Sequence, residues 1–183
     1  MEKKHTTENR TLQTARIILR PWKEADAEVL YEYARDPRVG PMAGWPAHTS
    51  VENIKDVLSA DETYAIVLKK TGEPVGSIGL MLNGKQGRDL GDKGGEIGYW
   101  IGVPFWGQGL VPEAVRELLR HGFEDLGLEN IWCGYYDGNE KSRRVQEKCG
   151  FTHHHTEHDV KCAMLDETRT EHFSRITKEQ WLQ

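Results

Sequence analysis

The residues that most clearly indicate a chemical function are the glycines of one turn. This turn lies between a predicted strand and the longest predicted helix. The turn reads Gly102-Val103-Pro104-Phe105-Trp106-Gly107-Gln108-Gly109-Leu110. The N-terminus of a helix exposes unpaired amide N–H groups and a partial positive charge. Glycines let the backbone approach a ligand closely and adopt positive φ. A strand, a glycine turn and a helix start together predict a site for an anion, typically a phosphate.

The residues around the turn exclude two common nucleotide-binding loops. A P-loop requires a Lys-Ser or Lys-Thr pair, and no such pair follows Gly109. A dinucleotide-binding fingerprint requires a third glycine, and Pro112 occupies that position. Taken alone, Gly107 and Gly109 are a weak signal that favours a tight turn without a ligand.

Several segments, in the right order along the chain, resemble the GNAT superfamily of N-acetyltransferases. Its cofactor-binding motif is matched by Glu96-Ile97-Gly98-Tyr99-Trp100-Ile101, the glycine turn and Glu113-Ala114. A second motif is matched by Asn139-Glu140-Lys141-Ser142 and Glu147-Lys148-Cys149-Gly150-Phe151. The opening Ile18-Leu19-Arg20-Pro21-Trp22 is similar to the branch that acetylates the N-termini of ribosomal proteins. Two positions depart from the family's pattern, because Trp106 replaces a frequent Gln or Arg and Val111 replaces Gly or Ala.

The resemblance implies that acetyl-CoA binds at the turn as a co-substrate. The backbone amides of Gln108, Gly109, Leu110 and Val111 would then face the pyrophosphate, with Trp106 and Gly107 completing the turn. The strand end formed by Ile101, Gly102 and Val103 would hydrogen-bond the pantetheine arm, and one N–H there would polarise the thioester carbonyl. Asn139 and Ser142 would lie near the pantetheine and the sulfur. A plain helix cap is an equally good explanation of Asn139.

Acyl transfer to an amine creates two proton problems, since an amine with a pKa near ~10 must lose a proton and the departing thiolate must leave. Glu96 is the candidate base, because it is a carboxylate in an otherwise apolar strand and the family has an acid there. The open alternative is an ordinary solvent-facing glutamate. Many GNAT enzymes use as the acid a tyrosine at the position where this chain has Gln146. Ser142 is the substitute that the ribosomal-protein branch suggests, ahead of Tyr135 and Tyr136, and an unprotonated leaving thiolate stays open.

The positions of apolar residues predict the elements that must hold these groups. Strands are expected at 15–20, 63–69, 74–82, 96–101, 130–135, from 151 and at 170–176, and helices at 23–34, 109–126 and 140–148. We predict an α/β (α+β) fold with one mixed, mostly antiparallel sheet flanked by helices. The resemblance adds that the sheet is splayed between the strands at 96–101 and 130–135. Residues 1–13 read as a flexible polar tail, and 14–183 as a single domain.

The acceptor is the least specified part of the prediction. In this fold it is expected to bind between the loop at 38–50, the loop after Met81 and the last strands, and Met42 and Trp45 suggest an apolar lining. A protein N-terminus and a small-molecule amine both fit, by direct attack in a ternary complex rather than through an acetyl-cysteine. A non-catalytic acetyl-CoA-binding or sensory module is the alternative, which Glu96 disfavours. Many members of the branch are dimers, so a homodimer is a further expectation.

Composition limits the partners and the compartment. A net charge of −5, from 24 basic and 29 acidic residues, gives no general attraction to nucleic acid or to an anionic membrane. Three cysteines without CxxC spacing favour a reducing, cytoplasmic location. No metal is expected at the cluster His153-His154-His155, because neighbouring strand residues point to opposite faces and at most His153 and His155 would converge.

Overall fold

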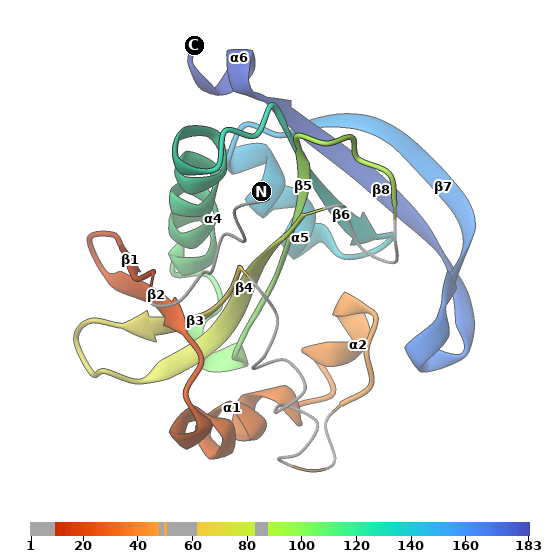
Figure 1. Cartoon of the computed structure of the whole chain (residues 1–183). Helices are drawn as coiled ribbons and strands as arrows, with labels where there is room; N and C mark the ends of the chain where they lie inside the picture. The colour runs from red at the N-terminus through yellow and green to blue at the C-terminus, as the bar shows by residue number, and fades with distance from the viewer. Residues whose placement is uncertain (1–9, 48–49, 51–61, 83–87) are drawn as a thin grey trace, which may run out of the picture.

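The computed structural model describes residues 10–47, 50, 62–82 and 88–183 of the chain. The described strands form one sheet of eight strands in the order β1-β2-β3-β4-β5-β6-β8-β7 (Figure 1). Neighbouring strands are antiparallel, except for β5 and β6, which are parallel. The predicted single mixed, mostly antiparallel sheet is therefore confirmed.

The strands are β1 (Leu12–Gln13), β2 (Ile17–Pro21), β3 (Thr63–Leu68), β4 (Pro74–Leu82), β5 (Gly94–Ile101), β6 (Asn130–Tyr136), β7 (Thr152–Cys162) and β8 (Glu167–Thr177). The α-helices are α1 (Ala27–Ala34), α2 (Gly40–Ala43), α4 (Leu110–Arg120), α5 (Glu140–Lys148) and α6 (Lys178–Trp181). Short 3-10 turns lie at Glu24–Asp26, Val103–Phe105 and Ala163–Leu165.

Three local predictions need correction. Leu12 and Gln13, assigned to the polar tail, pair with β2, and Leu12 is buried in the core. The loop expected at 38–50 contains α2, because Pro41 suits the first turn of a helix and Gly44, at φ 92°, ends it. The helix expected at 109–126 is α-helical only to Arg120.

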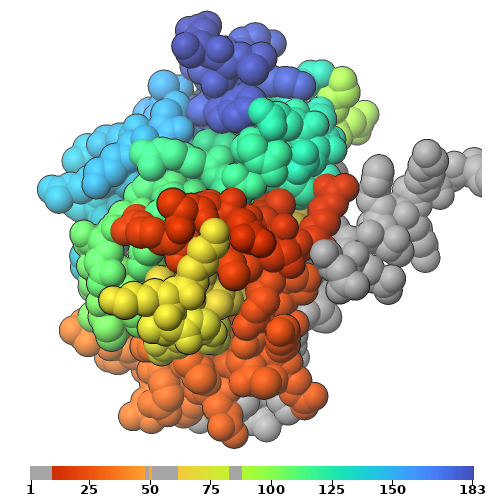
Figure 2. All heavy atoms as spheres, turned by 90° about the vertical axis from the view of Figure 1, so that its left-hand side faces the viewer, coloured from red at the N-terminus to blue at the C-terminus, as the bar shows by residue number. Residues whose placement is uncertain are grey.

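Helices cover both faces of the sheet. Side chains of β5 point alternately to one layer of helices and to the other. The apolar stripe of α4 packs with Ile97 and Tyr99 in the main core. Trp100, which points to the opposite face, packs instead with Leu30 and Ala34 of α1. Figure 2 looks onto the side where the red N-terminal residues lie next to the yellow β3–β4 turn and to the green residues of the glycine turn and α4.

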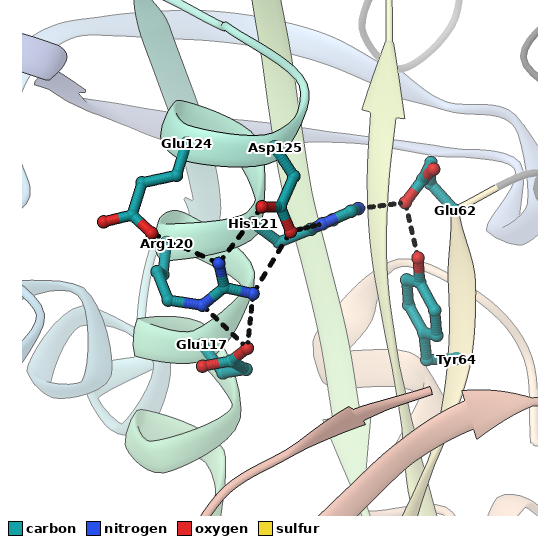
Figure 3. A network of polar contacts seen from close by, with 7 residues as sticks. All are labelled: Glu62, Tyr64, Glu117, Arg120, His121, Glu124 and Asp125. Atoms are coloured by element: carbon teal, nitrogen blue, oxygen red, sulfur yellow. Dashed lines mark hydrogen bonds and ion pairs between the residues drawn. The ribbon is translucent and has the colours of Figure 1, made fainter. Parts of the chain in front are cut away.

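The end of α4 widens into a π-helical turn at His121–Asp125, which surrounds a buried histidine. The His121 ring is fully buried, and its Nδ1 and Nε2 lie 2.7 and 3.0 Å from carboxylate oxygens of Asp125 and Glu62 (Figure 3). A carboxylate only accepts hydrogen bonds, so both ring nitrogens must donate and the ring is an imidazolium. Burial lowers the pKa of His121, but its bonds to Glu62 and Asp125 outweigh burial and raise it. The cation joins α4 to the residue that precedes β3.

No helix among the described residues combines the length and the apolar character that a membrane span requires.

Candidate functional site

The candidate site is the gap where β5 and β6 separate. The two strands are paired from Gly94–Asn130 to Ile97–Cys133. Beyond that point β5 continues beside β4 as far as Ile101, while β6 continues beside β8 as far as Tyr136. A cleft of about 590 Å³ opens between them. The splay that the resemblance implied between these two strands is confirmed.

The glycine turn closes one end of this cleft with unpaired amides. Gly107 and Gly109 both have φ of 74°, a left-handed conformation that favours glycine, and Gly109 directly precedes α4. Within the described residues, the backbone N–H groups of Gln108, Gly109, Leu110 and Val111 make no hydrogen bond. Four orphan donors at the positive end of an 11-residue helix are an arrangement that can bind an anion.

The strand end beside the turn offers fewer groups to a ligand than the sequence suggested. The Gly102 N–H donates to Val75 O over 2.9 Å, so Gly102 faces β4 rather than the cleft. Because backbone groups alternate along a strand, Tyr99 and Ile101 direct theirs toward the gap. The Ile101 carbonyl accepts a hydrogen bond from the indole N–H of Trp106 over 3.1 Å. The gap-facing groups that a ligand could use are therefore the N–H groups of Ile101 and Tyr99 and the carbonyl of Tyr99.

The predicted donor-site residues divide into two groups by their positions. Those that line the cleft are Ile101, Trp106, Gly107, Gly109, Leu110, Val111, Asn139 and Ser142. Gly102, Val103 and Gln108 are not part of this lining. Trp106, a departure from the family's pattern, has the Lys141 ammonium 3.5 Å from its ring centre, so it ties the turn to α5.

Ser142 lies at the centre of a small hydrogen-bonded group. Its backbone N–H is capped by the Asn139 side chain over 3.2 Å, which confirms the predicted helix cap. Its Oγ lies 2.8 Å from the hydroxyl of Tyr99 and 3.4 Å from Nε2 of Gln146. Burial raises the pKa of Tyr99 well above that of an ordinary phenol, so its proton stays on. Either hydroxyl can donate in the contact between Tyr99 and Ser142; if Tyr99 and Gln146 both donate to Oγ, the Ser142 hydrogen is free for a group bound in the cleft.

Sequence reasoning missed Tyr99 as a site residue. Its position on the face of β5 that carries Ile97 and Ile101 suggested core packing, and nothing local shows that α5 brings Ser142 to its hydroxyl.

Glu96 lies beneath the cleft and not in its lining. Its side chain is 1% exposed, and its Oε1 is 3.7 Å from Nη1 of Arg88. The same guanidinium donates from Nη2 to Glu171 Oε2 over 3.1 Å, and Glu171 does line the cleft. Arg88 also lies over the Phe173 ring, 4.1 Å from its centre. One partly buried arginine therefore joins the predicted base to a second carboxylate.

Glu171 and Arg88 were likewise not predicted as site residues. The signal for Glu171 was its strand alternation with Phe173, which places both side chains on the face that carries Glu96. Gly134 makes room for it, because a Cβ there would lie 2.6 Å from Glu171 Oε1.

The far end of the cleft has an aromatic and sulfur-containing lining. Met42 lies in it together with Trp100 and Tyr136. Trp45 stands one layer behind, packed edge to face on Trp100 with ring centres 5.8 Å apart. A second hollow of about 320 Å³ adjoins this end and shares Met42 and Tyr136 with the cleft.

The histidine cluster differs from the prediction. A bulge between His153 and His155 shifts the register of β7 against β8, so His154 is an extra residue in the strand. The rings that meet are consequently those of His154 and His155, with their Nδ1 atoms 2.8 Å apart, and not those of His153 and His155. Across the part of the chain that the structure describes, no three His, Cys, Asp or Glu side chains could hold a metal ion together.

Comparisons with known proteins agree with this geometry. A family model described as an acetyltransferase (GNAT) domain matches residues 16–152. An uncharacterized N-acetyltransferase, p20 of Bacillus licheniformis, is 33% identical over 77% of this chain and 82% of its own.

Solved structures share the fold. A GNAT-family acetyltransferase from Bacillus anthracis superposes with a TM-score of 0.81 at 22% identity, over 93% of this chain and 99% of that one. The ribosomal-protein-S5-alanine acetyltransferase from Vibrio fischeri superposes with a TM-score of 0.69 at 16% identity, over 94% and 98% of the two chains.

Proposed function

The chain belongs to the GNAT family of acetyltransferases, and from this premise we propose that it moves an acetyl group from acetyl-CoA to a primary amine by direct attack in a ternary complex. The proposal rests on the chemical difference between the two ends of one cleft. One end has the four unpaired amides of the glycine turn, and the other has the buried carboxylate of Glu171.

The donor half of the reaction uses backbone groups. The amides of residues 108–111 hold the pyrophosphate, and the gap-facing backbone of Tyr99 and Ile101 holds the pantetheine arm as an added strand. The Ile101 or Tyr99 N–H then lies at the edge of the gap and donates to the thioester carbonyl as negative charge develops on its oxygen.

The acceptor half uses the group formed by Glu96, Arg88 and Glu171. An amine enters as a cation and must lose a proton before its lone pair can attack. Glu171 faces the cleft and accepts this proton, directly or through water, while Glu96 beneath it is the second carboxylate bound to Arg88. Two carboxylates around one guanidinium keep one net negative charge, which attracts an ammonium ion.

The transfer step is balanced by Ser142. The amine nitrogen forms a bond to the thioester carbonyl carbon, the C–S bond breaks, and the sulfur leaves with the bonding electrons. The nitrogen loses its second proton as the amide forms, and this proton reaches the departing thiolate through the Ser142 hydroxyl, which Tyr99 holds by a hydrogen bond over 2.8 Å. Cys149 takes no part, because its thiol points at Pro112 O and burial raises its pKa to about 11.

We expect the acceptor to be an amine that binds beside the aromatic residues of the cleft. Trp100 and Tyr136 line the cleft, aromatic rings attract cations, and the Arg169 guanidinium already lies 5.1 Å from the centre of the Tyr136 ring. Glu171 supplies the opposite charge. Protein N-termini are one candidate, since a ribosomal-protein acetyltransferase shares the fold. Small-molecule amines are the other.

A thiol-release screen tests the proposal. Acetyl-CoA is offered with a panel of peptide N-termini and a panel of small amines, and free CoA is followed with a thiol reagent. The proposal predicts amine-dependent release with at least one panel. Binding of acetyl-CoA without release by any amine would contradict it and favour a non-catalytic module.

A further inference from the structure

A residue just before β2 holds the glycine turn from outside the cleft. Nη1 of Arg16 donates to the carbonyl oxygen of Gln108 over 2.8 Å. Nε and the backbone N–H of Arg16 donate to the two carboxylate oxygens of Glu113 over 2.7 and 2.8 Å. The Thr14 hydroxyl donates to Glu113 as well. One arginine therefore connects the turn, the first turn of α4 and the N-terminal strands, whose red residues lie beside green ones in Figure 2.

The bond to Gln108 fixes the direction of one amide of the donor site. In a trans peptide the carbonyl of one residue and the N–H of the next point in opposite directions, and the chain has no cis bonds among its described residues. Holding the Gln108 carbonyl toward Arg16 turns the Gly109 N–H away from Arg16. Gly109 lines the cleft, and within the described residues this N–H has no acceptor.

The bond to Glu113 controls the charge next to the anion site. A carboxylate in the first turn of α4 favours the helix but repels a pyrophosphate bound at the same end. Burial raises the pKa of Glu113, but its hydrogen bonds from Thr14 and Arg16 outweigh burial and lower it, so the group is ionised. Arg16 is the cation that neutralises it, with the guanidinium half exposed and Glu113 mostly covered.

We propose that Arg16 is a positioning residue for the acetyl donor: it holds the Gln108 carbonyl so that the Gly109 amide faces the pyrophosphate, and it neutralises Glu113 beside that site. The inference rests on the proposed function, because it assumes that the turn binds CoA. Arg16 itself need not touch the ligand.

The test compares CoA binding by calorimetry in the wild type and in Arg16→Ala. We expect the dissociation constant for CoA to rise about tenfold, since a charge-assisted hydrogen bond and a neutralising charge are lost together. Arg35→Ala is the matched control, because Arg35 forms an exposed ion pair with Glu32 on α1 and its loss changes net charge equally. That variant should bind CoA within about twofold of the wild type.

Two further measurements separate positioning from general stability. In Arg16→Ala/Glu113→Gln the repelling carboxylate is gone, so we expect part of the lost CoA affinity to return. In turnover, Arg16→Ala should raise KM for acetyl-CoA with kcat almost unchanged, and should leave kcat/KM unchanged for S-acetylpantetheine, a donor without a pyrophosphate.

Equal CoA affinity in Arg16→Ala and the wild type would overturn the inference. An equal loss with S-acetylpantetheine would also overturn it, because the defect would then not concern the pyrophosphate. A wild-type protein that binds no CoA would instead contradict the proposed function, so the two failures are distinguishable.

Discussion

The hydroxyl of Tyr99, in the middle of β5, lies 2.8 Å from Oγ of Ser142, in the first turn of α5. The contact joins the two sides of the gap where the sheet splays. It also holds the proposed acid beside Gln146, which occupies the position where many GNAT enzymes have a tyrosine.

Removal of either hydroxyl should slow the chemical step. We expect Ser142→Ala to lower kcat on the order of a hundredfold, and Tyr99→Phe about tenfold, because general acid catalysis contributes at least that much. KM for acetyl-CoA should hardly change. Steady-state kinetics with both substrates varied checks this, and Tyr135→Phe is the control, since Tyr135 also lines the cleft. Normal kinetics in Ser142→Ala would remove that residue from the mechanism.

The two carboxylates beside Arg88 should differ in effect. Glu171→Gln should lower kcat/KM for the amine on the order of a hundredfold, and at high pH, where the amine is already neutral, much of the loss should disappear. Glu96→Gln should leave CoA binding intact and should reduce turnover less than Glu171→Gln does, because Glu96 does not line the cleft. Calorimetry with CoA and pH profiles of both variants check this. A larger loss of turnover in Glu96→Gln than in Glu171→Gln would instead identify Glu96 as the base, acting through water.

Gly134→Ala offers a test of Glu171 that leaves its charge in place. The new Cβ would lie 2.6 Å from Glu171 Oε1 and 3.2 Å from the Phe173 ring. The end of a glutamate side chain can move aside, so we expect a small loss of stability but a roughly tenfold loss of kcat. Thermal unfolding and kinetics on the same preparation measure the two effects. Full activity would show that the carboxylate's position is not critical.

The fold and the donor end of the site follow largely from local sequence. Gly107 and Gly109 mark the turn, Asn139 marks the start of α5, and the spacing of apolar residues marks α4. The proposed acceptor end depends on Arg88 and Glu171, which only the tertiary structure brings together, and the contact between Tyr99 and Ser142 arises in the same way. The bulge at His154 could not be predicted for another reason, because a prediction from strand alternation assumes an unbroken register.

Stability should depend on pH through His121. Its folded pKa is raised, so its contribution to the free energy of unfolding is complete below the unfolded value of ~6.5 and is lost as pH rises through the folded value. The pKa values of Glu62 and Asp125 are lowered, so their contribution is lost as pH falls below about 4.5. The network in Figure 3 should therefore stabilise most between these limits.

Denaturant unfolding across this pH range checks the prediction. His121→Ala should cost about 3 kcal/mol near pH 6 and flatten the dependence above it, because the buried Glu62 carboxylate loses its cationic partner, which it shares with the exposed Asp125. His158→Ala, at an exposed position on β7, is the control. An unchanged pH dependence in His121→Ala would show that other groups cause it.

Acetyl transfer to an amine by direct attack can be followed by mass spectrometry of both products. The enzyme is mixed with acetyl-CoA and an amine that scores in the thiol-release screen, and acetylated amine, free CoA and intact protein are weighed in one quenched sample. Direct attack predicts acetylated amine and CoA in equal amounts from the first turnover, with the protein unmodified. CoA release without acetylated amine, or an acetyl group retained on the protein, would contradict it.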